Sequence, residues 1–148
     1  MNGAAITKQT LDFNGNPINS GLMHIVCANN DNTMFYHGTF EQGASLEGLS
    51  LGDAISWNNI PILENDISAF GNGLIQVSSG HLWFIYQAKN RDNHYCNTTR
   101  IIEYDGHKWS RSYPISFNPI SINNQHSGCS LTNRPDGNVV VPVSYTHL

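Results

Sequence analysis

Short runs of apolar and β-branched residues alternate with polar turn residues between positions 71 and 115. The three runs are residues 74–77, 81–86 and 98–104. Ser78-Ser79-Gly80 follows the first run, and a polar stretch at 89–97 follows the second. Short strands separated by turn residues at this spacing predict an antiparallel meander. We therefore expect one four-stranded sheet, or most of one, with a loop at 89–97.

A second region of the same kind lies nearer the N-terminus. Residues 21–28 and 33–40 are β-rich runs separated by a polar turn, which predicts a hairpin. Residues 1–17 show little pattern apart from a turn at 14–17. No stretch has sustained helical periodicity, so the chain is predicted to be all-β with little or no helix.

Parts of the pattern recur along the chain. Trp57 and Trp109 stand 52 residues apart, and each follows a turn and precedes a Pro-Ile pair. Residues 73–80 resemble residues 128–137, and a strand-like run follows each. Self-similarity at roughly forty to fifty residues in an all-β chain indicates propeller blades. We expect the two tryptophans to occupy equivalent positions on successive sheets.

The order of these elements resembles the sialidase superfamily and its bacterial neuraminidase repeats. Their Asp-box motif, Ser-x-Asp-x-Gly-x-Thr-Trp, lies on the hairpin at the outer end of a blade. Residues 102–109 keep Gly106 and Trp109, with Asp105 one place late. Residues 50–57 keep Ser50, Ser56 and Trp57 of the motif. Asp53 stands one place later than the motif aspartate, and Ala54 stands in place of the glycine. The resemblance implies a fold, because Asp-boxes also occur in proteins that are not enzymes.

The resemblance covers residues 20–142, and residues 136–142 are similar to a further strand of the family. A sialidase-like propeller has six blades, and at about fifty residues per blade this chain holds two to three. We therefore expect residues 1–148 to be a partial β-propeller domain, a fragment with open sheet edges that aggregates alone. The sequence starts with no signal-peptide pattern. Residues 143–148 resemble translated sequencing-adapter read-through and are interpreted as non-native sequence.

The composition of the chain limits the kinds of molecule that the protein is expected to bind. The net charge is −4, with seven Lys and Arg residues in total and no basic stripe, which argues against nucleic acid. No apolar run is long enough to span a membrane. Abundant Asn, Ser, Thr and Gly suit a secreted or cell-surface protein with many turns. The three cysteines and the scattered histidines lack metal-ligand spacing, so we expect buried thiols, no metal and no cofactor.

The resemblance also implies a catalytic residue. Family enzymes use an Asp acid/base, a Tyr nucleophile helped by a Glu, and three Arg residues that clamp the sugar carboxylate. The acid/base lies in a loop that corresponds here to residues 89–94, where Asp92 is the carboxylate. Asp92 is therefore the candidate catalytic residue, expected at the axis-facing end of its blade, with Asp105 at the opposite end. The alternative is a solvated turn aspartate.

Some family features are missing. The first clamp arginine belongs to an Arg-Ile-Pro run, and residues 70–73 stand in its place without an arginine. No motif selects a Tyr nucleophile or a clamp from the remaining residues, although Trp83, Tyr86 and Tyr95 are candidates to stack on sugar rings or to pack in the core. The prediction is an exo-acting glycosidase that removes a terminal, acidic sugar from a glycan substrate. The alternatives are a non-catalytic propeller that binds glycan or protein, and another propeller-fold glycoside hydrolase.

Overall fold

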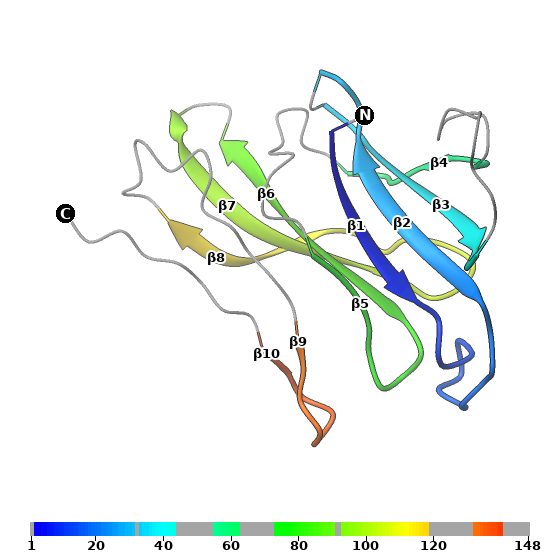
Figure 1. Ribbon diagram of the computed structural model, residues 1–148. Helices are drawn as coiled ribbons and strands as arrows, with labels where there is room; N and C mark the ends of the chain where they lie inside the picture. The colour runs from blue at the N-terminus through cyan, green and yellow to red at the C-terminus, as the bar shows by residue number, and fades with distance from the viewer. Residues whose placement is uncertain are drawn as a thin grey trace.

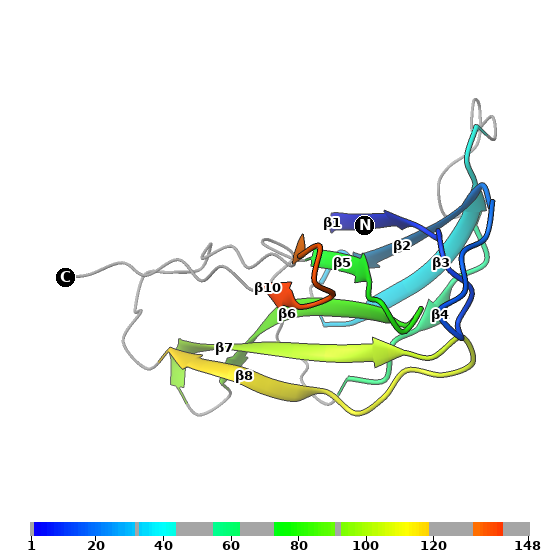
Figure 2. The ribbon, with the colours of Figure 1, turned by 90° about the horizontal axis from the view of Figure 1, so that it is seen from below.

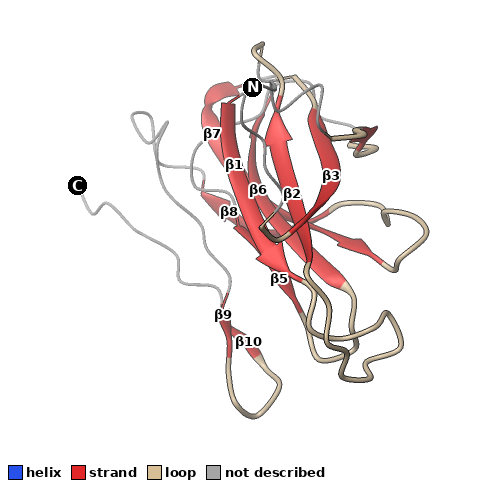
Figure 3. Cartoon of the chain, turned by 45° about the vertical axis from the view of Figure 1, so that its right-hand side comes forward, coloured by secondary structure: helices blue, strands red, loops and turns tan. Residues whose placement is uncertain are grey.

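The computed structural model describes residues 2–31, 33–43, 55–62, 73–90, 93–118 and 132–140. All regular elements in these residues are β-strands (Figures 1 and 3). The described residues contain no helix, so none that could cross a membrane. The prediction of an all-β chain is confirmed for this part of the sequence.

The first sheet has four antiparallel strands, each paired with its neighbours in the chain. They are β1 (Asn2–Lys8), β2 (Leu22–Ala28), β3 (Phe35–Glu41) and β4 (Asn58–Asn59). The hairpin of β2 and β3 confirms the prediction for residues 21–40. Strand β1 was not predicted, because Asn2-Gly3-Ala4-Ala5 has almost no β-branched residues. It forms through its ladder with β2, from Asn2–Ala28 to Lys8–Met23.

The second sheet is a meander of the same kind. Its strands are β5 (Gly73–Gln76), β6 (Leu82–Asn90), β7 (Asn93–Tyr104) and β8 (Tyr113–Asn118). The predicted loop at 89–97 is wrong, because Lys89 pairs with Asn97 and Asn90 with Asn93. Backbone pairing extends the two strands through polar sequence, since a ladder satisfies N–H and C=O groups whatever the side chains are.

A third hairpin follows, made of β9 (Thr132–Asn133) and β10 (Val139–Val140). Val139 packs on the face of the second sheet that points away from the first, against a cluster that includes Ile85 and Ile101. Figure 2 shows this hairpin beside β5. The first sheet, the second sheet and the third hairpin therefore form a row of three units in chain order.

The main core lies between the first two sheets. Val26, Ala28 and Phe35 of the first sheet belong to the same buried cluster as Leu82 and Phe84 of the second. The Phe35 and Phe84 ring centroids are 4.8 Å apart in an edge-to-face arrangement. Aromatic pairs in this geometry add about 1 kcal/mol beyond the area that they bury. The two sheets thus share a single core.

A turn of the same form joins the first two strands of each unit. In all three, the first residue donates its N–H to a carbonyl four residues later, and a glycine three residues later donates back to the first residue. The first residues are Asp12, Val77 and Arg134, and their glycines are Gly15 (φ 89°), Gly80 (φ 91°) and Gly137 (φ 84°). Glycine suits these positions because other residues rarely adopt a positive φ.

The turns of neighbouring units are in contact. A Cβ on Gly15 would lie 3.1 Å from the Ser78 carbonyl oxygen, and one on Gly80 would collide with the Asp12 carbonyl. A Cβ on Gly137 would lie 3.7 Å from Ser78 Oγ. The turns start 65 and 57 residues apart, further than the expected forty to fifty. The long connection from β3 to β4 accounts for the greater length of the first unit.

Candidate functional site

Asp92, the candidate acid/base, lies outside the residues that the structure describes. On either side of it in sequence, Asn90 and Asn93 are paired across β6 and β7. The other end of the β6–β7 ladder is the pair of Leu82 and Tyr104, next to Asp105. Most of β7 therefore separates Asn93 from the turn at Asp105-Gly106.

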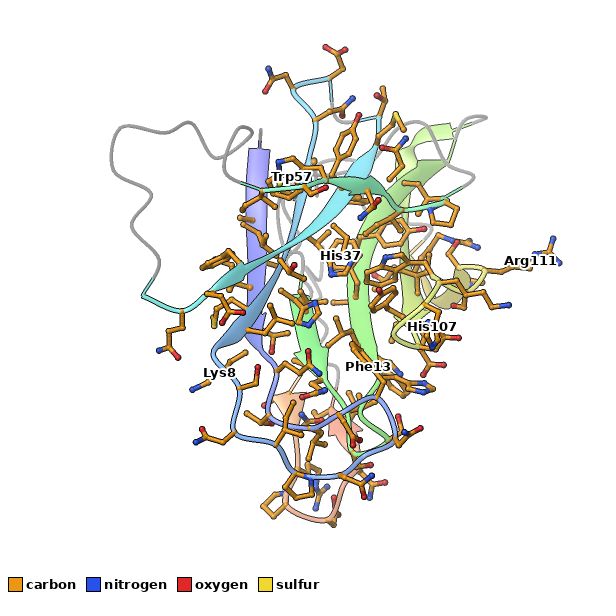
Figure 4. All side chains as sticks on the ribbon, turned by 90° about the vertical axis from the view of Figure 1, so that its right-hand side faces the viewer. Lys8, Phe13, His37, Trp57, His107 and Arg111 are labelled. Carbon is orange, nitrogen blue, oxygen red and sulfur yellow. The ribbon has the colours of Figure 1, made fainter. Side chains whose placement is uncertain are left out.

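The arginines of the described residues lie in three separate environments. Arg100, on β7, donates from Nε to Ser112 Oγ and from Nη2 to the Ser112 carbonyl, both at 3.1 Å. Arg134 forms an exposed ion pair with Asp136, with 3.5 Å between Nε and Oδ2. Arg111 points away from the body of the protein (Figure 4). Two of these three guanidinium groups are therefore engaged by groups of the protein itself, and the described residues show no carboxylate clamp.

The Asp105-Gly106 turn joins β7 to β8. Asp105 Oδ1 accepts hydrogen bonds from the backbone N–H groups of His107 (2.8 Å) and Lys108 (2.9 Å). The Lys108 N–H, and then that of His107, lower the pKa of Asp105. A carboxylate held by two backbone donors stabilises a turn and stays ionised, so this residue has a structural role.

Gly106 fits closely against the first unit. Its φ is 100°, and a Cβ there would lie 2.7 Å from the Phe13 ring. Phe13, in the first turn, also contacts Tyr104 at 5.6 Å between ring centroids, and the Tyr104 hydroxyl donates to the Gly106 carbonyl. The turn with the Asp-box resemblance is thus a docking point between the first and second units.

The two tryptophans occupy matching places. Trp57 directly precedes β4, and Trp109 lies at the start of the segment that leads into β8. Trp109 is buried against His37, with ring centroids 5.2 Å apart. Trp57 lies against Gly38, because a Cβ placed on Gly38 would be 3.1 Å from the Trp57 ring. His37 faces the second sheet, so its neighbour Gly38, and with it Trp57, lies on the opposite face of the first sheet. Trp109 lies on the face of the second sheet that packs on the first. Each tryptophan is therefore on the face of its sheet that points away from the following unit. This agrees with the predicted equivalence.

Two buried histidines form a hydrogen-bonded chain between the sheets. His24 and His37 are 2% and 4% exposed, and 3.0 Å separates His24 Nδ1 from His37 Nε2. His24 Nε2 lies 3.0 Å from Gln9 Oε1, while Gln9 Nε2 donates to the Leu11 carbonyl. This orientation makes Gln9 Oε1 an acceptor, so His24 donates from Nε2 and accepts at Nδ1 from His37.

The surroundings keep the pair neutral. Burial lowers the pKa of both His24 and His37 to about 4, and for His37 the neighbouring His24 adds to the effect. The rings of Tyr104 and Trp109 contact His37, and the Phe13 ring contacts His24. No group of three potential metal ligands occurs among the described residues. The sequence placed His24 and His37 on neighbouring strands but gave no sign of their contact.

A hollow of about 390 Å³ lies between the first sheet and the β7–β8 connection. Its lining residues are Pro61, Trp109, Ser110, Arg111 and Ser112. The hydroxyl of Ser110 accepts from the Glu103 N–H and donates to the Arg111 carbonyl. The hydroxyl of Ser112 accepts from Arg100. Both serines are therefore engaged in folding contacts.

The aromatic candidates for sugar stacking have structural roles where they are described. Tyr86 is fully buried between the sheets. Trp83 donates from Nε1 to Glu103 Oε2 at 2.6 Å and packs beside Ile85. The Tyr95 side chain lies outside the described residues. Cys27 is a buried thiol, as expected, whereas the side chains of Cys96 and Cys129 lie outside the described part.

Comparison with known proteins found no relative of this chain. No family model matches the chain, and no match was found among curated proteins or solved structures.

Proposed function

We propose that this chain forms consecutive blades of a sialidase-like β-propeller, in a protein that removes a terminal, acidic sugar from glycans. Two successive four-stranded meanders and the start of a third unit support the blade interpretation. The composition supports a secreted or cell-surface location, where such glycans are found. The imperfect Asp-box on the β7–β8 hairpin supports the choice of superfamily.

The observation that carries the proposal is a side-chain contact that repeats from unit to unit. Gln76 Nε2 donates to the Leu11 carbonyl at 2.9 Å, and Asn133 Nδ2 donates to the Gln76 carbonyl at 2.7 Å. Leu11, Gln76 and Asn133 each stand one place before the first residue of their turn. Each amide therefore binds the corresponding backbone atom of the preceding unit. A row of units in which each contacts its neighbours in the same way is typical of repeat architectures such as propellers.

In this proposal Asp92 is the acid/base. A proton donor must reach the glycosidic oxygen and be partly desolvated, which suits the axis-facing end of a blade. The Asp105 turn is a docking point and lies beyond the other end of β7. The two aspartates thus have separate roles, one chemical and one structural.

Matched substitutions of the two aspartates test this assignment. We expect Asp92→Asn to slow hydrolysis of an activated aryl glycoside of an acidic sugar by about a hundredfold or more. Asp105→Asn should leave kcat unchanged and lower the melting temperature, because an amide oxygen is a weaker acceptor for the His107 and Lys108 N–H groups. Full activity of Asp92→Asn, with the fold intact by circular dichroism, would refute the catalytic role.

A non-catalytic glycan-binding propeller is the second candidate. The observation in its favour is that the guanidinium groups of Arg100 and Arg134 are engaged by Ser112 and Asp136 of the protein itself. This candidate predicts saturable binding of a sialylated oligosaccharide by the wild-type chain, with no release of free sugar. Mass spectrometry of the recovered oligosaccharide separates binding from hydrolysis.

A further inference from the structure

The hollow between the first sheet and the β7–β8 connection is lined by residues of both units. Pro61 lies just after β4 of the first sheet, and Trp109, Ser110, Arg111 and Ser112 belong to the connection that leads into β8. Its volume of about 390 Å³ is at the lower end of the range for small-molecule sites, which is about 300–1,000 Å³. The hollow therefore has room for one ring-sized ligand that touches both units.

Two hydrogen-bond donors at the hollow are not used by the described residues. The Ser112 hydroxyl accepts from Arg100 Nε, and no described group accepts the hydroxyl proton. The Arg111 carbonyl accepts from Ser110, but the Arg111 guanidinium has no partner in the part of the chain that the structure describes. Arg111 is exposed and extends into solvent, so its side chain can turn toward a group in the hollow (Figure 4). One neutral and one charged donor are thus available to a ligand.

The rest of the lining is apolar or already engaged. Pro61 and the 9% exposed Trp109 supply apolar ring surfaces. The Ser110 hydroxyl both accepts and donates a hydrogen bond within the protein. No carboxylate is among the described lining residues. A guanidinium group binds a carboxylate through two parallel hydrogen bonds, and apolar walls favour a ring that loses water on binding. The lining therefore complements a ring that carries a carboxylate.

We propose that this hollow binds an organic acid made of one ring and a carboxylate. The carboxylate is bound by Arg111 and Ser112, and the ring lies against Pro61 and Trp109. A sugar acid and an aromatic acid share this chemistry. The hollow adjoins the Arg100 end of β7, whereas Asp92 adjoins Asn93 at the other end, so this is a binding site separate from the candidate catalytic loop. The proposal depends neither on hydrolysis nor on the interpretation of the units as blades.

NMR of the indole N–H groups, recorded on the full chain, tests the proposal. The three tryptophans give three signals, which Trp→Phe variants assign. Glucuronate and benzoate are the probes, and glucose and benzamide are their neutral counterparts. We expect the Trp109 signal to shift saturably with one or both acids. The neutral counterparts should bind about tenfold more weakly or less, because they lack the charge.

The Trp57 signal is an internal reference. The Nε1 groups of Trp57 and Trp109 are both buried and without an acceptor among the described residues, but only Trp109 lines the hollow. Binding in the hollow should therefore shift the Trp109 signal and leave the Trp57 signal in place. The acid with the higher affinity, glucuronate or benzoate, tells whether the natural ligand is a sugar acid or an aromatic acid.

Variants of the β7–β8 connection test the two donors. Arg111→Gln should weaken binding by about tenfold or more, because it removes the charge and the paired hydrogen bonds. Ser112→Ala should weaken binding by about fivefold, the effect of one hydrogen bond. Lys108→Gln is the matched control, since Lys108 is an exposed cation of the same connection that does not line the hollow, and it should leave the affinity unchanged. Circular dichroism checks that each variant is folded.

Three results would overturn the proposal. The first is a Trp109 signal that shows no saturable shift with either acid. The second is equal affinity for the acids and their neutral counterparts. The third is an equal loss of affinity in Arg111→Gln and Lys108→Gln, which would indicate general charge attraction and no defined site. The titration involves no hydrolysis, and Asp92→Asn should bind both acids as the wild-type protein does, so its failure is distinct from a failure of the Asp92 experiment.

Discussion

Replacement of Gln76 by leucine should separate the first two units. The Gln76 side chain is 8% exposed and forms four hydrogen bonds. Oε1 accepts from the N–H groups of Thr10 (2.9 Å) and Leu11 (3.0 Å), and Nε2 donates to the carbonyls of Leu11 (2.9 Å) and Gly80 (2.8 Å). Three of the four bonds join the second unit to residues 65 or 66 positions earlier in the chain.

The loss of unfolding free energy in Gln76→Leu follows from the number of backbone groups that lose a hydrogen-bond partner. Leucine has a similar volume but leaves the Thr10 and Leu11 N–H groups and the Gly80 carbonyl without this partner, whereas the Leu11 carbonyl keeps its hydrogen bond from Gln9. An unsatisfied buried group costs about 1–3 kcal/mol, and water can reach some of these partly buried groups, so we use the lower limit for each. The expected loss is about 3 kcal/mol of unfolding free energy, a large share of the 5–15 kcal/mol typical of folded proteins.

Urea unfolding followed by tryptophan fluorescence measures this loss. Gln42→Leu is the matched control, because Gln42 is exposed and only its backbone N–H takes part in a described hydrogen bond. We expect the control to change the unfolding free energy by less than about 0.5 kcal/mol. If Gln76→Leu costs less than about 1 kcal/mol, the amide contact does not hold the units together, and the repeated contact no longer supports consecutive blades.

Two further predictions concern the buried histidines and the turn glycines. The unfolding free energy should fall as the pH drops from 6.5 toward 4, because unfolded histidines bind protons there while His24 and His37, with pKa values of about 4, stay neutral. At pH 5 the expected loss is about 2 kcal/mol for each histidine, and urea unfolding of a His24→Phe, His37→Phe variant should give a flatter pH profile. Gly80→Ala should lower the melting temperature far more than Gly43→Ala. Both glycines have a positive φ, but only a Cβ on Gly80 meets another unit, so equal shifts in calorimetry would contradict close packing of the turns.

The sequence predicted the strands where local patterns determine them. Strands β2, β3, β5 and β6 follow from apolar and β-branched runs bounded by turn residues. Strand β1 and the first half of β7 have no such runs, and pairing with β2 and β6 determines them. Polar sequence in the β6–β7 hairpin was therefore interpreted as a loop.

The contacts between units were harder to predict. Gln76 and Leu11 are 65 residues apart, and local periodicity carries no information about pairs at that separation. One signal was available: residues 73–80 and 128–137 align Gly80 with Gly137, and an amide residue stands four places before each glycine. The catalytic assignment of Asp92 came from the family resemblance and stays a prediction.

The amide contact has a consequence for how such a chain can grow by duplication. The donor is a side chain, but the acceptor is a backbone carbonyl, which every residue possesses. A duplicated unit thus brings its own donor and meets a ready acceptor in its neighbour. Selection for this contact acts on the side chain before the turn in the later unit of each pair, whereas the acceptor in the earlier unit is a backbone atom and places no demand on the side chain there. Leu11 and Gln76 both accept through their backbone carbonyls although their side chains differ, so units joined in this way can diverge in sequence while their arrangement is kept.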